Sequence, residues 1–276
     1  MKSIIVRMNR PRLFPRFRTW VVLVLFALAG ATVTAHGAEW VETEGARLRM
    51  VLGQDAGDGR VRAMLDIDLK PGWKTYWREP GESGIPPTIT VRPAASAKVA
   101  FEFPAPEHVS DPYGGFTGYA EPVRLPVMLP SGASEAEVFL GVCQQVCIPV
   151  SASFSFSGDN APSPLHAAMV DQAFEALPSA PTEHLHVKTI ERSADGQALT
   201  VETAADAAQA SPRLFLAPLT ESGHVFGLPE LVEAKDGQAI FSVPILRRPD
   251  ETTALPRFSA TLVQGRASIR HDIGVE

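Results

Sequence analysis

Cysteine is scarce in this chain of 276 residues, in which Cys143 and Cys147 are the only two. The chain also lacks the Gly-x-Ser-x-Gly, His-Glu-x-x-His and phosphate-loop motifs, so a hydrolase function has no support. Beyond residue 30 no apolar run reaches the roughly 20 residues that a membrane-spanning helix needs. Because the chain has only two cysteines, any thiol or disulfide chemistry must come from this one pair.

Acidic residues are missing from the first 38 positions, which contain six of the chain's Lys and Arg residues. An apolar run, Trp20–Gly30, and a series of small residues follow. These are the parts of a secretory signal peptide, with cleavage predicted after Ala35 or Gly37. An uncleaved membrane anchor is the alternative, but the run is short for a span. No Arg-Arg pair precedes the run, which favours general secretion over the twin-arginine route.

Removal of this segment leaves 19 basic against 31 acidic residues, a net charge of −12. Such a charge argues against nucleic-acid binding, which requires a basic face. We therefore expect a soluble, exported product with no membrane span after signal cleavage. In an oxidising compartment outside the cytoplasm, two cysteines can form a disulfide.

Short strands separated by turns are predicted over most of the chain. Val61–Leu69 alternates with a period of two, and Asp195-Gly196 and Asp236-Gly237 are typical hairpin turns. Pro126 favours an edge strand. Further strands are expected at Ala46–Leu52, Trp73–Trp77, Thr88–Val91, Val99–Phe103, Leu125–Pro130, Ala152–Phe156, His186–Ile190, Ala198–Glu202, Leu214–Leu216, Ala239–Val243 and Phe258–Val263.

Residues 104–120 predict a long loop, with three aromatics and three glycines. Such loops are often binding loops or lids, although an irregular connection with its aromatics in the core is the alternative. One helix is expected after Ser163, which can cap it, with Pro164 at the first helical position. Its expected apolar stripe comprises Leu165, Ala168, Met169, Ala173 and Leu177.

The predicted fold class is all-β, with two antiparallel β-sandwiches joined by a linker that contains one short helix. Residues 1–38 are the expected signal peptide. Residues 39–160 form the expected N-terminal sandwich carrying the cysteine pair. Residues 161–181 are the helical linker and 182–276 the C-terminal sandwich.

The cysteine pair is expected on a hairpin, because both flanks predict strands and Gln144–Val146 predicts a short connection. Directly opposed residues lie about 4.5–5.5 Å apart at Cα, which a disulfide accepts. A disulfide that merely staples the hairpin closes about five residues and stabilises by roughly 2 kcal/mol, against about 4.7 kcal/mol for a 100-residue loop. Two thiols at this spacing can instead cycle through a mixed disulfide with a partner. No Lys, Arg or His lies immediately beside them in the sequence to favour a thiolate.

A Cu(I) site is another interpretation, because thiolates are suitable soft ligands for that ion. The Cys-x3-Cys spacing resembles that of copper-delivery proteins of the Sco family. Those proteins are thioredoxin-like, however, and this chain lacks the alternating βαβ pattern. The histidines that could complete such a site are His108, His166, His184, His186 and His224. A structural adhesion or assembly module is a third interpretation.

Five segments between residues 72 and 150 carry a resemblance to a known family. They are Gly72–Arg78, Phe103–Pro106, Asp111–Phe116, Tyr119 with Leu125–Val127, and Val142–Pro149. On these segments the chain resembles the periplasmic N-terminal domain of DsbD, and more closely the N-terminal region of its ScsB-type relatives. The resemblance implies an immunoglobulin-like fold, a redox dithiol on a hairpin and a second β-sandwich.

The resemblance also implies a function and a site. It implies a thiol–disulfide oxidoreductase that takes electrons from a membrane thiol–disulfide reductase and passes them to periplasmic thioredoxin-fold proteins. Cys143 and Cys147 would be the catalytic pair, with Cys147 forming the mixed disulfide and no cofactor beyond the pair itself. A cap loop is implied at Asp111–Gly115. The side chains expected to cover or border the pair are Asp111, Tyr113, Phe116, Tyr76 and Trp77.

Tyr113 is the expected shield over the sulfurs, and Phe116 is the alternative. The relatives continue into a transmembrane segment and a thioredoxin domain, whereas this sequence ends at Glu276. We therefore expect a separate protein as electron donor. The direction of electron flow stays open at this point.

Overall fold

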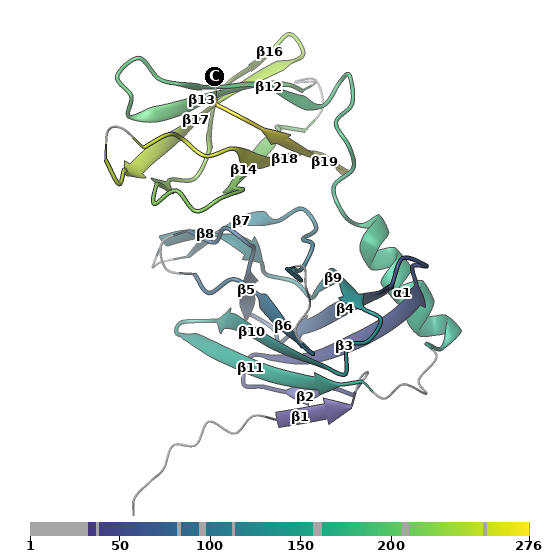
Figure 1. Ribbon diagram of the computed structural model, residues 1–276. Helices are drawn as coiled ribbons and strands as arrows, with labels where there is room; N and C mark the ends of the chain where they lie inside the picture. Colours follow the sequence, from purple (N-terminus) through teal and green to yellow (C-terminus); the bar gives the residue numbers. More distant parts are fainter. Residues whose placement is uncertain are drawn as a thin grey trace, which may run out of the picture. The chain divides into compact units, whose positions relative to one another are not determined.

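The computed structural model describes residues 33–36, 39–81, 84–93, 98–111, 114–156, 162–205, 210–250 and 253–275. Side chains are not described for residues 33–36, 109–111 and 114. Within these limits the chain forms two β-sandwiches joined by a linker with one helix, as the sequence predicts (Figure 1). The predicted signal peptide lies outside the described residues, except for the strand β1. No helix in the described part is long and apolar enough to cross a membrane.

The first sandwich contains two sheets that enclose one hydrophobic core. The larger sheet runs in spatial order through β1 (Val33–His36), β11 (Cys147–Ser155), β10 (Glu135–Cys143), β5 (Lys74–Tyr76), β8 (Gly114–Tyr119) and β7 (Glu107–Asp111), and β6 (Thr88–Arg92) also pairs with β10. The smaller sheet runs through β2 (Val41–Glu42), β3 (Ala46–Asp55), β4 (Arg60–Leu69) and β9 (Val123–Pro130). All pairs are antiparallel except β1 with β11. Pro126 lies on β9 at a sheet edge, as predicted.

Alternation along β4 builds the core of this sandwich. Ala63, Leu65 and Ile67 are fully buried between the sheets, which confirms the predicted period of two. Met64 points to the other face and is equally buried, because α1 (Pro164–Glu175) covers that face. The smaller sheet is therefore buried on both sides where the helix crosses it (Figure 1).

The helix begins as the sequence predicts, with the Ser163 hydroxyl accepting a hydrogen bond from the His166 backbone N–H at 3.2 Å. The predicted apolar stripe is confirmed at Ala173, which is buried, and at Met169, which packs against the same cluster, but is wrong at its N-terminal end. Ala167, Val170 and Ala173 are the buried residues, whereas Leu165 and Ala168 are exposed.

Gly53 on β3 explains this orientation of the helix. A Cβ at Gly53 would come within 2.8 Å of Val170 Cγ1, so the missing side chain makes room for Val170 against the sheet. The sequence of the helix alone does not contain this information.

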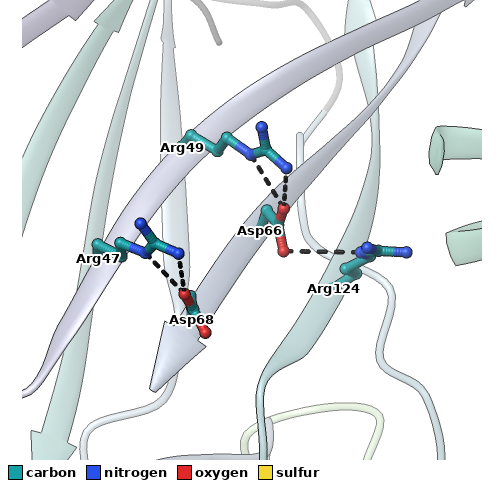
Figure 2. Close-up of polar contacts among 5 residues, drawn as sticks. All are labelled: Arg47, Arg49, Asp66, Asp68 and Arg124. Atoms are coloured by element: carbon teal, nitrogen blue, oxygen red, sulfur yellow. Dashed lines mark hydrogen bonds and ion pairs between the residues drawn. The ribbon is translucent and has the colours of Figure 1, made fainter. Parts of the chain in front are cut away.

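Ion pairs cross the same outer face (Figure 2). Arg47 and Arg49 on β3 lie opposite Asp68 and Asp66 on β4, at N–O distances of 2.6 and 2.7 Å. Arg124 on β9 approaches Asp66 from the other side, with its Nε 3.6 Å from Oδ1. The strand register places these opposite charges directly across from one another, an arrangement that contributes roughly 0.2–1 kcal/mol per pair.

The second sandwich likewise contains two sheets around one core. One runs through β12 (His186–Arg192), β13 (Ala198–Ala204), β17 (Gln238–Arg247) and β15 (Val225–Phe226), and β16 (Glu230–Lys235) also pairs with β17. The other contains β14 (Arg213–Pro218), β18 (Phe258–Gln264) and β19 (Ala267–Ile273). The predicted turn Asp236-Gly237 connects β16 to β17, and both residues have positive φ, 54° and 75°.

Two segments of the first sandwich differ from the prediction. Val99–Phe103 contributes an isolated bridge between Phe101 and Val127 in place of a strand. Residues 104–120 are not one long loop, because β7 and β8 form a hairpin that pairs with β5. Gly118 permits this pairing, since a Cβ at that position would collide with the carbonyl oxygen of Thr75.

Candidate active site

The cysteine hairpin has the predicted geometry. β10 ends at Cys143, β11 begins at Cys147, and the two residues are register partners joined by a disulfide. Their Cα atoms are 4.1 Å apart, close to the ~4.5 Å of a non-hydrogen-bonded antiparallel pair. Gln144–Val146 form the exposed connection.

The two sulfur-bearing residues differ in their access to solvent. Cys143 is 2% exposed, whereas Cys147 is exposed together with the connecting loop, in which Val146 is 72% exposed. Cys147 is therefore open to solvent, whereas Cys143 is not.

Tyr76 links the disulfide to the neighbouring strand β5. Its hydroxyl oxygen lies 2.9 Å from the Sγ atoms of both Cys143 and Cys147. Disulfide sulfurs have no proton, so the Tyr76 O–H is the donor and sulfur the weak acceptor. Gly141 makes room for the ring, because a Cβ there would lie 3.1 Å from Tyr76 Cε2.

Lys74 and Phe116 complete the cover on this face. Lys74 on β5 is the register partner of Cys143, and its Nζ lies 4.8 Å from the centroid of the Phe116 ring. The rings of Phe116 and Tyr76 meet edge to face, 5.2 Å apart. Lys74, Phe116 and Tyr76 thus form one contiguous group, which reaches the sulfurs through the Tyr76 hydroxyl.

The remaining residues predicted for the site are placed as follows. Trp77 comes directly after Tyr76, so strand alternation turns it to the opposite face, where it is 1% exposed in the core. Tyr113 lies outside the described residues. For Asp111 only the backbone is described, at the end of β7 opposite Gly114.

A family comparison covers this part of the chain. Residues 47–157 match the family described as "Thiol:disulfide interchange protein DsbD, N-terminal". They include both cysteines, Tyr76 and Phe116. Residues 47–157 form a DsbD N-terminal-like domain.

A solved structure resembles the chain over a greater length. The chain is similar to the crystal structure of the N-terminal periplasmic domain of ScsB from Proteus mirabilis, with a TM-score of 0.71 and 23% identity over 86% of this chain and 98% of that one. This likeness shows the fold, which is that of immunoglobulin-like β-sandwiches. No curated protein matches the chain.

Sequence reasoning missed one lysine and two glycines around the disulfide of this DsbD N-terminal-like domain. It found no cation beside the cysteines, because Lys74 is far from them in the chain and becomes their neighbour only through the β5–β10 register. It also gave no role to Gly118 and Gly141, which make room for strand and ring packing. The signal for Lys74 was its position two residues before Tyr76, which puts both on one strand face.

Two titratable groups on β7 and β8 are perturbed by burial. Burial lowers the pKa of His108 on β7, whose Nδ1 lies 3.3 Å from the Thr117 hydroxyl. Burial raises the pKa of Tyr119 well above its ordinary value, and its hydroxyl donates to the Pro104 carbonyl at 2.8 Å. Both groups are therefore neutral at pH 7.

The residues proposed as copper ligands do not gather. Among the described residues no group of three or more His, Cys, Asp or Glu side chains could hold a metal ion. This set includes both cysteines and the five histidines considered from the sequence. A cavity of about 500 Å³ beside Trp40, Arg49 and Arg124 shares no lining residue with the disulfide and its cover.

Proposed function

We propose that this chain is an exported thiol–disulfide interchange protein that passes reducing equivalents from a membrane thiol–disulfide reductase to periplasmic thioredoxin-fold proteins. The observation that carries the proposal is the Cys143–Cys147 disulfide, with one residue exposed and the other buried under Tyr76. Residues 39–160 would be the redox domain, 161–181 the linker and 182–276 a second domain.

The chemistry follows from the difference in exposure. A donor thiolate attacks Cys147 Sγ, the Cys143–Cys147 bond breaks, and the electron pair leaves on Cys143 Sγ. A second donor thiolate then attacks the donor sulfur of the mixed disulfide and releases Cys147 as a thiolate. The donor is oxidised to a disulfide and the protein is reduced by two electrons. The reverse sequence, with Cys147 attacking a partner disulfide, passes the electrons on.

The family description supports the interchange chemistry, and the periplasmic origin of the similar ScsB domain supports export. The predicted signal peptide agrees with that location. Phe116 and Tyr76 support a covered rather than an open disulfide.

Trapping of the partner tests the proposal. The Cys143→Ala variant keeps the exposed Cys147 and should accumulate a mixed disulfide in the periplasm, detected by non-reducing electrophoresis and identified by mass spectrometry. The Cys147→Ala variant keeps only the buried Cys143 and is the matched control, with little or no trapping expected. The wild-type pair should have a reduction potential above about −300 mV, because inert structural disulfides lie below that value.

Two outcomes would overturn the proposal. One is a potential below about −300 mV with no mixed disulfide from either variant. The other is stoichiometric Cu(I) binding by the reduced protein that is lost in the double Cys→Ser variant and in one His→Ala variant, without partner trapping. A double Cys→Ser variant with full activity in the cell would instead indicate an adhesion or assembly module.

A further inference from the structure

Three residues form a row across three paired strands at the disulfide. Lys74 on β5 is the register partner of Cys143 on β10, which is in turn the partner of Cys147 on β11. Partners in an antiparallel ladder present their side chains on the same face, with Cα atoms about 4.5–5.5 Å apart. The row therefore continues from the exposed sulfur through the buried sulfur to a lysine that is only 9% exposed.

The position of Cys143 in this row makes it the leaving group in the proposed reaction. Attack on Cys147 Sγ places a negative charge on Cys143 Sγ, which is buried and cannot be solvated by bulk water. Burial of a thiolate without a compensating charge disfavours it, and a poor leaving group slows exchange. The site therefore needs a positive charge or hydrogen-bond donor on the buried side.

Lys74 is placed to provide that charge. Its ammonium group lies over the face of the Phe116 ring, which is attractive for a cation and anchors the side chain within the cover. Phe116 contacts Tyr76, whose hydroxyl reaches both sulfurs. Lysine, hydroxyl and ring are thus fixed with respect to one another.

We infer that Lys74 is a positioning residue that stabilises the Cys143 thiolate when the disulfide opens, with Tyr76 as the hydrogen-bond donor to the same sulfur. This inference rests on the proposed function and deepens it. The electron pair of the broken S–S bond stays on Cys143 Sγ, and Lys74 is the register partner of that residue on the neighbouring strand. The second donor thiolate then releases Cys147 from the mixed disulfide, which completes the reduction.

The neighbouring strands β8, β10 and β11 contribute no other cation that could stabilise the Cys143 thiolate. β10 contributes Gly141, β11 contributes Cys147 and β8 contributes Phe116, and none of these provides a cation. His108 on β7 contacts Thr117, the neighbour of Phe116 on the opposite strand face, and its pKa is lowered by burial. The side chain of Asp111 on β7 is not among those described.

The test measures the thiol and the exchange step separately. In a Cys147→Ala background, the pKa of Cys143 is followed by thiolate absorbance at about 240 nm against pH. Lys74→Met should raise that pKa by about one unit or more, because an opposite charge within about 4–6 Å typically shifts a pKa by 1–3 units. In the full chain with both cysteines, Lys74→Met should slow reduction of the disulfide by dithiothreitol severalfold.

Two variants control the experiment. Lys74→Arg keeps the positive charge, so its disulfide should be reduced at close to the wild-type rate, unlike that of Lys74→Met. A purely structural role of Lys74 would not predict this difference between the two variants. Lys188→Met removes a lysine from β12 in the second sandwich, with the same change in net charge, and should leave both readouts unchanged. An unchanged Cys143 pKa in Lys74→Met, or equal effects of Met and Arg, would overturn the inference. Because dithiothreitol replaces the partner, this result is independent of whether a partner is trapped.

Discussion

Tyr76 and Phe116 are the aromatic side chains that we propose as the cover of the disulfide. The ring of Phe116 lies against Tyr76, and Tyr76 donates from its hydroxyl to the sulfurs. Phe116 itself is only half-buried, so it can be displaced at a lower cost than a core residue. The cover is therefore held in place by edge-to-face contact and by the nearby ammonium group rather than by deep burial.

Truncation of Phe116 should open the site. We expect Phe116→Ala to increase the rate of alkylation of reduced Cys147 by iodoacetamide severalfold, because the ring no longer restrains Tyr76. Phe139→Ala is the matched control, since Phe139 is 42% exposed on β10 and makes no ring contact with the site in the described residues. Equal alkylation rates for Phe116→Ala and wild type would show that this ring does not cover the thiols.

At the level of elements, the β7–β8 hairpin depends on Gly118. β8 approaches β5 so closely that a side chain at Gly118 would meet the backbone oxygen of Thr75 and the ring of Phe116. Backbone atoms cannot move aside as a flexible side chain can. Only glycine at position 118 therefore permits the strand pairing with Tyr76.

Gly118→Ala should separate β8 from β5 and expose the cysteine pair. We expect a loss of about 1–3 kcal/mol in the free energy of unfolding, as for other overpacked sites, together with faster alkylation of the reduced thiols. Gly132→Ala is the control, because no atom lies within 4 Å of a Cβ at that turn position. Urea unfolding and alkylation rates check the two effects, and an unchanged alkylation rate would contradict the role of the hairpin.

Local signals explain which elements were predictable from the sequence. The cysteine hairpin, the alternation of β4 and the Asp236-Gly237 turn depend on residues adjacent in the chain, and all three are confirmed. The β7–β8 hairpin was missed because the need for glycine at position 118 comes from the carbonyl oxygen of Thr75, 43 positions away. The row that includes Lys74 was missed for the same reason, because it depends on non-local register.

At the scale of the whole molecule, residues of the second sandwich contact residues of the first. The Phe215 ring on β14 lies 4.4 Å from the ring of His108 on β7 and 6.2 Å from that of Trp77, between centroids. Arg270 on β19 forms an ion pair with Glu102 at 2.6 Å. The first hydrophobic cluster accordingly includes Phe215 from the second sandwich.

The burial of His108 predicts a pH dependence of global stability. Burial is the main cause that lowers its pKa, and the charge of Arg213 acts in the same direction. Above about pH 6.5, the ordinary histidine value, His108 is neutral in the folded and unfolded chains and has no effect. As the pH falls below that value, the unfolded chain binds the proton first, so stability decreases until the lower folded pKa is reached.

The urea midpoint should therefore fall between pH 7.5 and pH 5.5, and His108→Gln should reduce that fall. His184→Gln, which alters an exposed histidine, should leave the fall unchanged. Identical pH profiles for wild type and His108→Gln would show that His108 does not set the dependence.

The nine register pairs between β10 and β11 have a kinetic consequence for any covalent complex. They hold Cys143 beside Cys147 even when Cys147 is bonded to another protein, so the buried thiolate is an intramolecular competitor for that bond. Well-oriented intramolecular reactions reach effective molarities of roughly 10⁵–10⁸ M, far above the concentration of any free thiol. The ladder thus makes each mixed disulfide short-lived, and the lifetime of the complex is set by the chain's own geometry rather than by the affinity of the partner.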